Sequence, residues 1–336
     1  MSSIHGFGLG IAGKSSAGEI LDVFYPAPLH NISGDLAEVV AGISGELDAS
    51  GLNDLEAAFR KVGAEQQALV AQQLKDSSRS VIACTLDTNT APQTVADAYL
   101  KLHLLSHRLV RPHGTTLDGI FSLLPNVAWT DEGAISLDEL PERQLSARLR
   151  GKVLEVSSVD KFPKMTNYVV PSGVRIAHTA RVRLGAYLGE GTTVMHEGFI
   201  NFNAGTEGPG MVEGRISAGV WVGAGSDLGG GCSTMGTLSG GGNIIISVGK
   251  ECLIGANAGV GIPLGDRCTV EAGLFITAGT KVTVLDGARK PVETVSARNL
   301  ADRSDLLFRR NSTSGVVECL TNRSAIELNE TLHANN

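Results

Sequence analysis

The feature that most constrains the fold is a six-residue spacing of aliphatic side chains in the second half of the chain. A six-residue period is typical of a parallel β-helix, in which each aliphatic side chain points inward from a flat face and small residues turn the corners. Three faces would give about 18 residues per coil. Of the 42 glycines, 27 fall between Pro171 and Lys290, where tight corners need them. Fifteen positions keep the period, with a few shifts of phase: Ile176, Val182, Leu188, Val194, Ile200, Ile216, Val222, Leu228, Val248, Ile254, Val260, Leu264, Val270, Ile276 and Val282.

Two larger phase shifts interrupt this pattern, at residues 201–215 and 229–247. Insertions in a repeat wall usually leave it as loops, and such loops often carry the functional site. We therefore expect loops at both places. Glu213 lies in the first segment, and the glycine runs Gly229–Gly231 and Gly240–Gly242 lie in the second. The backbone N–H groups of such runs are unshielded and suit an oxyanion or a closely bound thioester.

The first 150 residues have a different pattern. Apolar residues recur at helical spacing from Leu52 to Leu74 and from Val95 to Leu102. Strands are predicted at residues 81–86 and 152–159. We predict a mainly β protein with an N-terminal α/β domain (residues 1–165), a β-helix domain (166–285) and a C-terminal extension (286–336) that contains a helix at 325–332.

Two phosphate-binding patterns occur near the N-terminus. Gly8, Gly10 and Gly13 match G-x-G-x-x-G, and Gly8–Ser15 matches the P-loop pattern G-x4-G-K-S. Too few residues precede them for a buried strand, and Gly18 and Pro26 interrupt the segment where the supporting helix would run. We therefore expect a glycine-rich terminal strand and turn here and no nucleotide site.

The histidines offer two further metal-binding patterns. His103 and His107 are four residues apart on a predicted helix but lack the glutamate of H-E-x-x-H, so two polar histidines on an amphipathic helix are expected. His178 and His196 are 18 residues apart, so one coil should stack them. A γ-carbonic anhydrase would need a third zinc histidine, and the repeat region contains only these two.

Charge and cysteine content restrict the partners and the compartment. The net charge of −7 argues against a protein that binds nucleic acid or an anionic membrane. Five scattered cysteines without a CxxC pair favour a reducing compartment. The N-terminus does not have the pattern of a signal peptide, and no apolar run reaches the roughly 18 residues of a membrane span. We expect a soluble, cytoplasmic protein. Within this acidic chain, residues 281–310 carry a net charge of +3, which fits either a site for phosphate groups or a solvated basic face.

Long segments of the sequence resemble one enzyme family. They are MHEGFINFNAGTEGPGMVEGRISAGVWVGAGSDLGGGCSTMGTLSGGGN (195–243), GANAGVGIPLGDRCTVEAGLFITAGT (255–280), LLFRRNS (306–312) and, near the N-terminus, YLKLHLLSHRLVRPHG and LLPNVAWT. Together they resemble the long form of tetrahydrodipicolinate N-succinyltransferase, a hexapeptide-repeat acyltransferase, over nearly the whole chain.

This resemblance implies a left-handed parallel β-helix, which is an exception to the usual right-handed crossover. It also implies a homotrimer with active sites between neighbouring subunits. The implied reaction moves the succinyl group of succinyl-CoA, the co-substrate, to the amino group of ring-opened tetrahydrodipicolinate. The products are N-succinyl-2-amino-6-oxopimelate and CoA, in lysine and diaminopimelate biosynthesis.

The resemblance also assigns roles to particular residues. The glutamate of MVEG, Glu213, is the catalytic position, acting as an acyl-anhydride nucleophile or as a general base. The glutamate of MHEG, Glu197, corresponds to one ligand of a magnesium ion on the trimer axis in some relatives, whose second acidic ligand falls on Ala180 here. A lysine that contacts the coenzyme in relatives falls on Ser296. The positions implied for succinyl-CoA are Arg215, Gly230, Ser233, Ala256, Glu271, Ala272, Gly279, Arg309, Arg310, Asn311 and Ser312.

The residues alone leave several alternatives open. Acylation of an amine needs a proton acceptor and donors for an oxyanion, and Glu213 could be either that acceptor or a solvated loop residue. His196 is a competing base, since many hexapeptide acyltransferases use histidine. A related acyltransferase that uses acetyl-CoA and a non-enzymatic β-helix are the other functions considered.

Overall fold

The computed structural model describes residues 3–236 and 244–321. The chain divides into two compact units, which are described separately below. The first comprises residues up to Pro163 with Asn167–Val169, and the second comprises Lys164–Thr166 and the chain from Val170 onward.

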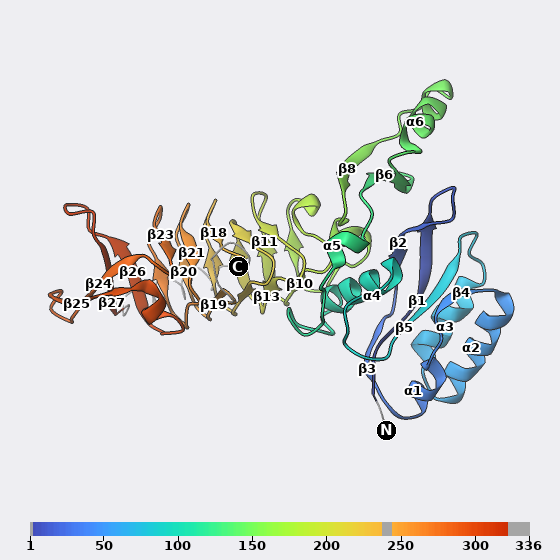
Figure 1. Cartoon of the computed structure of the whole chain (residues 1–336), viewed down its shortest axis with the longest axis horizontal. Helices are drawn as coiled ribbons and strands as arrows, with labels where there is room; N and C mark the ends of the chain where they lie inside the picture. Colours follow the sequence, from blue (N-terminus) through green and yellow to red (C-terminus); the bar gives the residue numbers. More distant parts are fainter. Residues whose placement is uncertain (1–2, 237–243, 322–336) are drawn as a thin grey trace. The chain divides into compact units, whose positions relative to one another are not determined.

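The first unit is built on a five-stranded sheet whose central strand is β1 (Ile4–Lys14). The strand order is β2-β1-β5-β4, and β3 also pairs with β1 (Figure 1). All these pairings are antiparallel. The other strands are β2 (Ile20–Phe24), β3 (Leu29–Ile32), β4 (Gly45–Leu47) and β5 (Val81–Leu86). The predicted strand at 81–86 is thus confirmed.

Helices cover both faces of this sheet (Figure 1). Phe7 and Leu9 of β1 pack into a core with α1 (Gly34–Val40), α2 (Ala49–Lys61) and α3 (Glu65–Leu74). The single helical run expected from Leu52 to Leu74 is therefore two helices, separated at Gly63, whose φ of 74° favours glycine. On the other face lies α4 (Val95–Ser106), which begins at a capping box between Thr94 and Asp97.

The glycines of β1 allow α4 to pack directly on the strand backbone. A Cβ at Gly8 would lie 2.6 Å from the Tyr25 ring and 2.9 Å from Leu100, and one at Gly10 would lie 2.1 Å from the Phe24 carbonyl oxygen. Residues 6–14 pair with β5 and β2, so their N–H groups are not gathered around a phosphate. The G-x-G-x-x-G pattern here therefore serves close packing, as the strand interpretation predicted.

A smaller three-stranded sheet completes the first unit. It has the order β7-β6-β8, with strands β6 (Val127–Thr130), β7 (Gly133–Ser136) and β8 (Val156–Asp160). The short helix α5 (Ile120–Leu123) precedes it, and α6 (Leu140–Leu149) packs Ala147 against Ile135 and Leu154. The strand predicted at 152–159 begins four residues later than expected.

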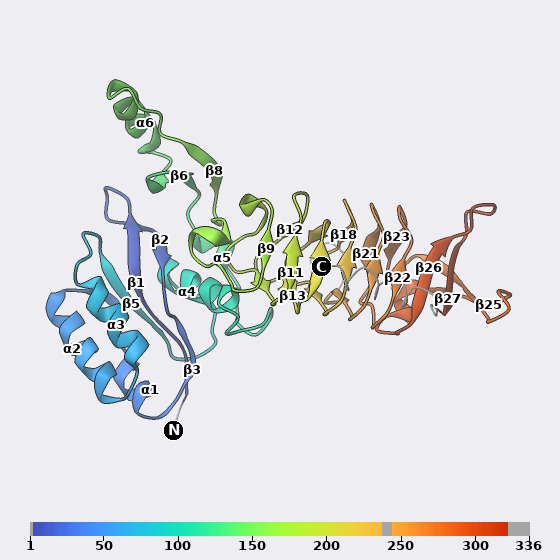
Figure 2. The same cartoon turned by 180° about the vertical axis from the view of Figure 1, so that it is seen from behind.

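The second unit is a three-sided coil of short parallel strands (Figures 1 and 2). Successive strands join the three sheets in turn and pair with the strands of neighbouring coils. The first face contains β9 (Arg175–Ile176), β11 (Thr192–Val194), β14 (Gly210–Val212), β17 (Asp227–Leu228), β20 (Leu253–Ile254) and β22 (Thr269–Val270). The second contains β12 (Phe199–Ile200), β15 (Arg215–Ile216), β18 (Ser233–Thr234), β21 (Gly259–Gly261) and β23 (Phe275–Thr277). The third contains β10 (Tyr187–Leu188), β13 (Gly205–Thr206), β16 (Trp221–Val222) and β19 (Ser247–Val248).

The predicted aliphatic positions form the core of this coil. Every one from Val182 to Val282 is at most 3% exposed, and only Ile176, in the first strand, is half-buried. The six-residue period therefore identifies the inward-facing residues.

The first predicted loop is wrong. Residues 201–215 continue the wall as β13 and β14, and Thr206 and Val212 occupy the inward positions. Thr206 escaped the aliphatic pattern because it is polar, and its hydroxyl is satisfied by Thr192 at 2.7 Å between the two Oγ1 atoms. The phase shifts because Ile216 comes four positions after the preceding inward residue, Val212, instead of six.

The second phase shift is an insertion. Thr234 keeps the six-residue spacing from Leu228 and is fully buried, and 14 residues then separate it from Val248 on the third face. Residues 237–243, which include Gly240–Gly242, lie outside the described part of the chain.

The last strands cap the coil. β26 (Leu306–Arg310) continues the first face by pairing in parallel with β22, and β27 (Val317–Thr321) pairs antiparallel with β26. β24 (Lys281–Leu285) and β25 (Pro291–Ser296) extend the same sheet as a hairpin. The helix predicted at 325–332 lies outside the described residues. In the described ranges, we find no helix that is both long and apolar enough to span a membrane.

Candidate active site

Most of the predicted site residues lie along one edge of the coil. We define the first corner as the segments that join the first face to the second: 195–198, 213–214, 229–232, 255–258 and 271–274. Because the coils stack in register, these segments lie next to one another although they are far apart in sequence. The first corner contains Glu197, Glu213, Gly230, Ala256, Glu271 and Ala272.

Hydrogen bonds connect these segments into a continuous line. The Asn257 N–H donates to the Gly230 carbonyl at 2.9 Å, and the Gly273 N–H donates to the Ala256 carbonyl at 2.8 Å. At the end of the line, the Arg310 N–H donates to Glu271 Oε2 at 2.7 Å. The segment 309–312, which begins with the last two residues of β26, thus extends the first corner by one step.

Glu213 lies in the one shortened segment of the first corner. Only Glu213 and Gly214 link β14 to β15, whereas four residues link the strands in the other coils of the first corner. A Cβ on Gly214 would lie 2.3 Å from the Cys232 sulfur, so a glycine is needed where the chain turns this tightly. Glu213 is half-buried as a result, and we find no hydrogen bond or ion pair to its carboxylate in the described ranges.

Gly230 leaves space beside this carboxylate. A Cβ at Gly230 would lie 3.6 Å from Glu213 Oε2, and no other atom of the described residues, its chain neighbours apart, would be within 4 Å of it. The unpaired carboxylate therefore faces an open position, into which a reacting group can fit.

A pocket of about 350 Å³ lies on the first corner and the second face; Gly214 and Arg215, which follow Glu213 in the chain, line it, whereas Glu213 itself does not. Its lining residues are Arg181, Glu197, Phe199, Gly214, Arg215, Gly231 and Cys232. The predicted residues Arg215 and Ser233 meet on the second face, where Arg215 Nε and Nη2 donate to Ser233 Oγ at 3.2 and 2.9 Å. Burial raises the pKa of the Cys232 thiol to about 12, with Glu213 adding to this rise and Arg215 opposing it. The thiol is therefore protonated at neutral pH and unsuited to act as a nucleophile.

Arg181 and Cys232 also line this pocket, although the sequence did not predict them as site residues. Arg181 could have been found from the period itself, because the residue before each inward position of the second face points outward. This rule places Arg181, Phe199, Arg215 and Ser233 in one outward-facing column, and three of these four residues line the pocket.

Glu197, one coil before Glu213, has a different environment. Its side chain is 67% exposed and accepts hydrogen bonds from Arg181 Nη2 at 2.7 Å and His196 Nδ1 at 2.9 Å. The His196 hydrogen bond and the Arg181 charge hold the pKa of Glu197 below its usual range. His178 and His196 lie next to each other on neighbouring coils as predicted, with ring centroids 5.3 Å apart in an edge-to-face arrangement.

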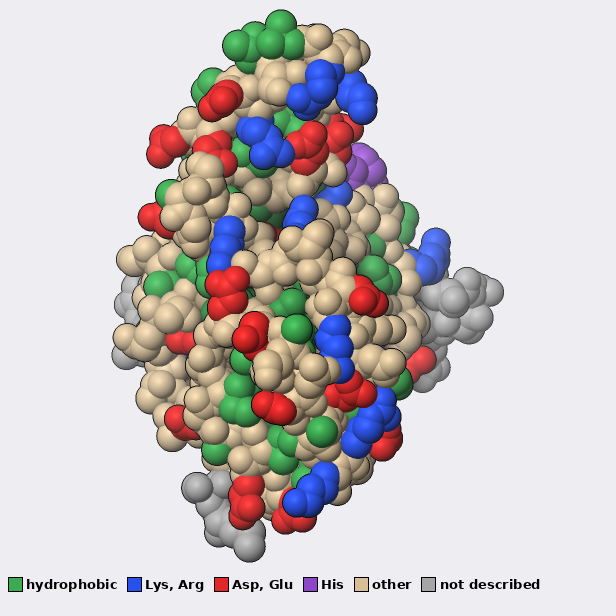
Figure 3. All heavy atoms as spheres, turned by 90° about the vertical axis from the view of Figure 1, so that its right-hand side faces the viewer, with side chains coloured by type: hydrophobic (Ala, Val, Ile, Leu, Met, Phe, Trp, Pro, Cys, Tyr) green, Lys and Arg blue, Asp and Glu red, His purple; other side chains and the backbone are tan. Residues whose placement is uncertain are grey.

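Three of the predicted coenzyme positions differ from one another in their location or in their charge partners. Gly279 lies in the turn after β23, beyond the second face, and not in the first corner. Arg309 is committed to an ion pair with Glu318, whereas Arg310 is exposed. On the face drawn in Figure 3, which is the right-hand side of Figure 1, basic and acidic side chains are interspersed.

The histidines of α4 are not exposed as the amphipathic pattern suggested. His103 is fully buried; its Nδ1 bonds the Tyr99 carbonyl at 2.7 Å, and its Nε2 accepts the Tyr25 N–H at 3.2 Å. Burial lowers the pKa of His103 to about 3. In residues 3–236 and 244–321, no group of three or more His, Cys, Asp or Glu side chains is placed to hold a metal ion.

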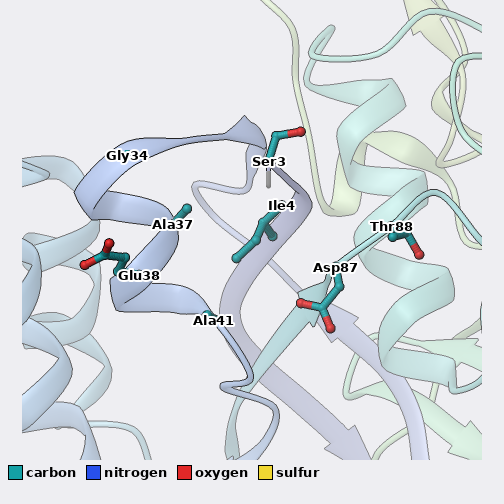
Figure 4. A pocket seen from close by; sticks show the side chains of 8 residues that line it. All are labelled: Ser3, Ile4, Gly34, Ala37, Glu38, Ala41, Asp87 and Thr88. Carbon is teal, nitrogen blue, oxygen red and sulfur yellow. The ribbon is translucent and has the colours of Figure 1, made fainter. Parts of the chain in front are cut away.

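The first unit contains a pocket of about 440 Å³, drawn in Figure 4. Ile4 and Ala37 face each other across it, and Glu38 points away from both. No lysine, arginine or histidine lines this pocket. A polyanionic coenzyme therefore has no counter-charge here, and the first corner is the better candidate.

A coil of six-residue repeats with carboxylates along one corner is the architecture of the hexapeptide-repeat acyltransferases. In agreement with this class, the family model for a hexapeptide repeat of succinyl-transferase matches residues 245–278. The family model for the middle part of tetrahydrodipicolinate N-succinyltransferase matches residues 124–164.

Full-length relatives define the family further. The chain is 62% identical to 2,3,4,5-tetrahydropyridine-2,6-dicarboxylate N-succinyltransferase of Pseudomonas putida, with 100% of this chain and 99% of the relative covered. It is 57% identical to the enzyme of the same name from Vibrio cholerae, with 98% of each covered. A crystal structure of a Campylobacter jejuni protein, provisionally assigned as a 2,3,4,5-tetrahydropyridine-2-carboxylate N-succinyltransferase, superposes with a TM-score of 0.87 at 32% identity, covering 97% of this chain and 94% of that one. The chain belongs to the tetrahydrodipicolinate N-succinyltransferase family and is an acyltransferase.

Proposed function

We propose that the protein transfers the succinyl group of succinyl-CoA to the amino group of ring-opened tetrahydrodipicolinate, forming N-succinyl-2-amino-6-oxopimelate and CoA. The observation that carries this proposal is the environment of Glu213: a half-buried carboxylate, unpaired within the described residues, with open space at Gly230 and with its chain neighbours Gly214 and Arg215 lining the pocket that contains two arginines.

In the proposed reaction, the substrate amine attacks the thioester carbonyl carbon, the C–S bond breaks, and the CoA sulfur leaves. As a general base, Glu213 takes the proton that the amine loses and returns it to the departing thiolate. As a nucleophile, Glu213 first forms an acyl anhydride with release of CoA, and the amine then attacks that anhydride. Both routes need the carboxylate free of ion pairs, which is the state in which the fold holds it.

The pocket beside Glu213 is proposed to hold the carboxylate end of the acyl group. Arg215 is the group best suited to this task, because its guanidinium is exposed on the second face and its one side-chain hydrogen-bond partner among the described residues, Ser233, is uncharged. A guanidinium binds a carboxylate through two parallel hydrogen bonds, which would favour a succinyl over an acetyl group.

Magnesium does not enter this proposal. The Glu197 carboxylate is already occupied by Arg181 and His196, and Ala180, at the position of the second acidic ligand, has no ligating side-chain atom. The donor set of this chain therefore does not fit the oxygen-rich site that magnesium prefers.

The proposal extends to assembly and compartment. We propose a left-handed coil, domains at 1–165, 166–285 and 286–336, and a cytoplasmic homotrimer with sites between subunits. The 53% exposure of Phe275 on the second face supports burial against another chain. The five cysteines are all buried and unpaired, which supports a reducing compartment. Light scattering should give a mass near three chains, and a monomer at micromolar concentration would contradict the intersubunit site.

A thioester-consumption assay tests the reaction. With tetrahydrodipicolinate as acceptor, the protein should consume succinyl-CoA at a rate that depends on the acceptor, and acetyl-CoA much more slowly. Mixing enzyme and succinyl-CoA without acceptor separates the two roles of Glu213. A nucleophile predicts rapid release of about one CoA per site and a hydroxylamine-sensitive acyl-enzyme. A general base predicts neither. Equal rates with both thioesters would contradict the proposed role of Arg215.

A further inference from the structure

Glu318 is a buried carboxylate to which neither the motifs nor the resemblance assigns a role. It lies on β27 directly opposite Arg309 of β26 and is 8% exposed. Its Oε2 accepts hydrogen bonds from Arg309 Nε at 3.0 Å and Nη2 at 2.9 Å. Its Oε1 accepts one from Asn311 Nδ2 at 2.8 Å. Both oxygens of the Glu318 carboxylate thus accept hydrogen bonds from segment 309–312, one from Asn311 and the other from Arg309.

The other contacts of this segment also fix its shape. Asn311 Oδ1 accepts the N–H groups of Thr313 and Ser314, each at 3.0 Å, which closes the turn that follows β26. From the opposite side, Glu271 of the first corner accepts the Arg310 N–H. The segment is therefore held between a carboxylate of the repeat wall and a carboxylate of β27.

This arrangement gives the two adjacent arginines different roles. The Arg309 charge is compensated by Glu318 within the chain, in a partly buried pair. Arg310 is exposed, and its Nη1 donates only to the Gly315 carbonyl at 3.0 Å, so its positive charge has no carboxylate partner in the described residues. A phosphate needs such an uncompensated guanidinium.

We propose that Glu318 is a positioning residue for the coenzyme: through Arg309 and Asn311 it fixes segment 309–312 so that the Arg310 guanidinium and the backbone beside it meet the phosphates of the nucleotide part of CoA. Arg309 is then an internal counter-ion and not a phosphate ligand. This inference rests on the proposed function, because it concerns the same coenzyme.

The ionised state of Glu318 suits this role. The Asn311 amide and the Arg309 guanidinium hold the pKa of Glu318 below its usual range, against the opposing effect of burial. The carboxylate is therefore charged at neutral pH, and removal of its charge leaves Arg309 uncompensated beside the coenzyme segment.

The test compares Glu318→Gln with the wild type on two thioesters, succinyl-CoA and succinyl-pantetheine, which lacks the nucleotide. We expect the KM for succinyl-CoA to rise about tenfold or more, as is typical when a hydrogen bond to a charged group is lost. The kcat and the KM for succinyl-pantetheine should stay within about twofold of wild type, because the reacting end is unaffected. Glu293→Gln on β25 is the matched control, an exposed acid of the same extension that should change neither KM.

An unchanged KM for succinyl-CoA would overturn the inference. An equal rise for both thioesters would also overturn it, because this is the result of general structural damage. If Glu318→Gln does not fold, the variants Arg309→Gln and Arg310→Gln test the proposal instead. Arg310→Gln should raise the KM for succinyl-CoA without changing the melting temperature, whereas Arg309→Gln should lower the melting temperature. An Arg309→Gln variant that only weakens coenzyme binding would make Arg309 a phosphate ligand and refute the proposal.

Failure of the proposed function gives a separate result. If the wild type turns over neither thioester, that function is wrong, and titration calorimetry with CoA itself then tests the positioning role. Glu318→Gln should weaken CoA binding about tenfold. Unchanged CoA affinity, or no CoA binding by the wild type, refutes the role of Glu318.

Discussion

Glu197 and Glu213 occupy the same corner of neighbouring coils, yet the fold treats their carboxylates in opposite ways. Glu197 lies in a corner segment of regular length, extends into solvent, forms an ion pair with Arg181 and is hydrogen-bonded by His196. Glu213 lies in the shortened segment, is half-buried and has no charged partner in the described ranges. The two corner segments differ in length by two residues. The longer one holds its carboxylate in an exposed ion pair, and the shorter one leaves its carboxylate available for reaction.

The largest expected effect comes from removing the available carboxylate. Glu213→Gln keeps the size of the side chain but can neither accept a proton nor form an anhydride. Turnover should fall by roughly 10²–10⁴-fold, as is typical for a lost acid or base group, while succinyl-CoA binding is retained. Steady-state kinetics and calorimetric binding measure the two effects. Near-normal turnover would move the catalytic base to His196, for which His196→Gln is the direct comparison.

Restoring the regular length of the corner should have the next largest effect. Insertion of Gly-Ser between Glu213 and Gly214 returns the spacing from Val212 to Ile216 to six residues, so the wall should tolerate it. The carboxylate moves away from its pocket, and turnover should fall about 100-fold, since small misplacements of reacting groups have this cost. Thermal melting and kcat report the two properties. The same insertion in the turn between β24 and β25 is the control and should leave kcat unchanged.

The contrast between buried and exposed positions also predicts a pH effect, in the first unit. Burial gives His103 a folded-state pKa of about 3, below the ordinary value of 6.5 in the unfolded chain. The unfolded state therefore binds more protons between these values, and the stability of the first unit should fall as the pH drops from about 6.5 towards 3. Denaturant unfolding of His103→Gln should show a shallower pH dependence than that of the wild type. Parallel slopes for the two proteins would contradict the burial of His103.

The smallest effect is expected at Glu197. Exposed ion pairs contribute about 0–1 kcal/mol, so Glu197→Gln should change kcat or KM less than about fivefold. Chelation with EDTA should alter neither the activity nor the mass of the wild type, because Glu197 is engaged by Arg181 instead of a metal ligand set. A loss of activity that is reversed by magnesium would show that the ion pair opens to bind the cation.

The sequence predicted the wall of the second unit well because aliphatic residues at inward positions carry a direct signal. The prediction failed where a polar residue takes an inward position. Residues 201–215 were not recognised as part of the wall because Thr206 is polar, and its buried hydroxyl is hydrogen-bonded to Thr192 of the neighbouring coil. For this reason the shortened corner at Glu213 was misread as a loop. A pairing between side chains in different coils has no signature in a single sequence.

The candidate site was predictable to a similar degree. Stacking of Glu197, Glu213 and Glu271 at one corner follows from their positions after first-face strands. The different roles of Arg309 and Arg310 do not, because they depend on Glu318, whose position opposite Arg309 is set by the antiparallel return of β27. In the first unit, the interpretation of Gly8 and Gly10 as strand residues was confirmed, but the burial of His103 under Tyr25 needed the tertiary structure.

The stacking of one corner from successive coils also determines when each part of the site comes into existence on the ribosome. Synthesis proceeds at about 5–20 residues per second, and each coil can add to the one before it as it emerges. Every residue that lines the pocket beside Glu213 has been made once the chain reaches Cys232. Arg310 and Glu318 are translated several seconds later. In a nascent chain, the proposed catalytic carboxylate and the acyl pocket can therefore form before the segment proposed to bind the coenzyme has been synthesised. The coenzyme site is completed only when the last strands have been made.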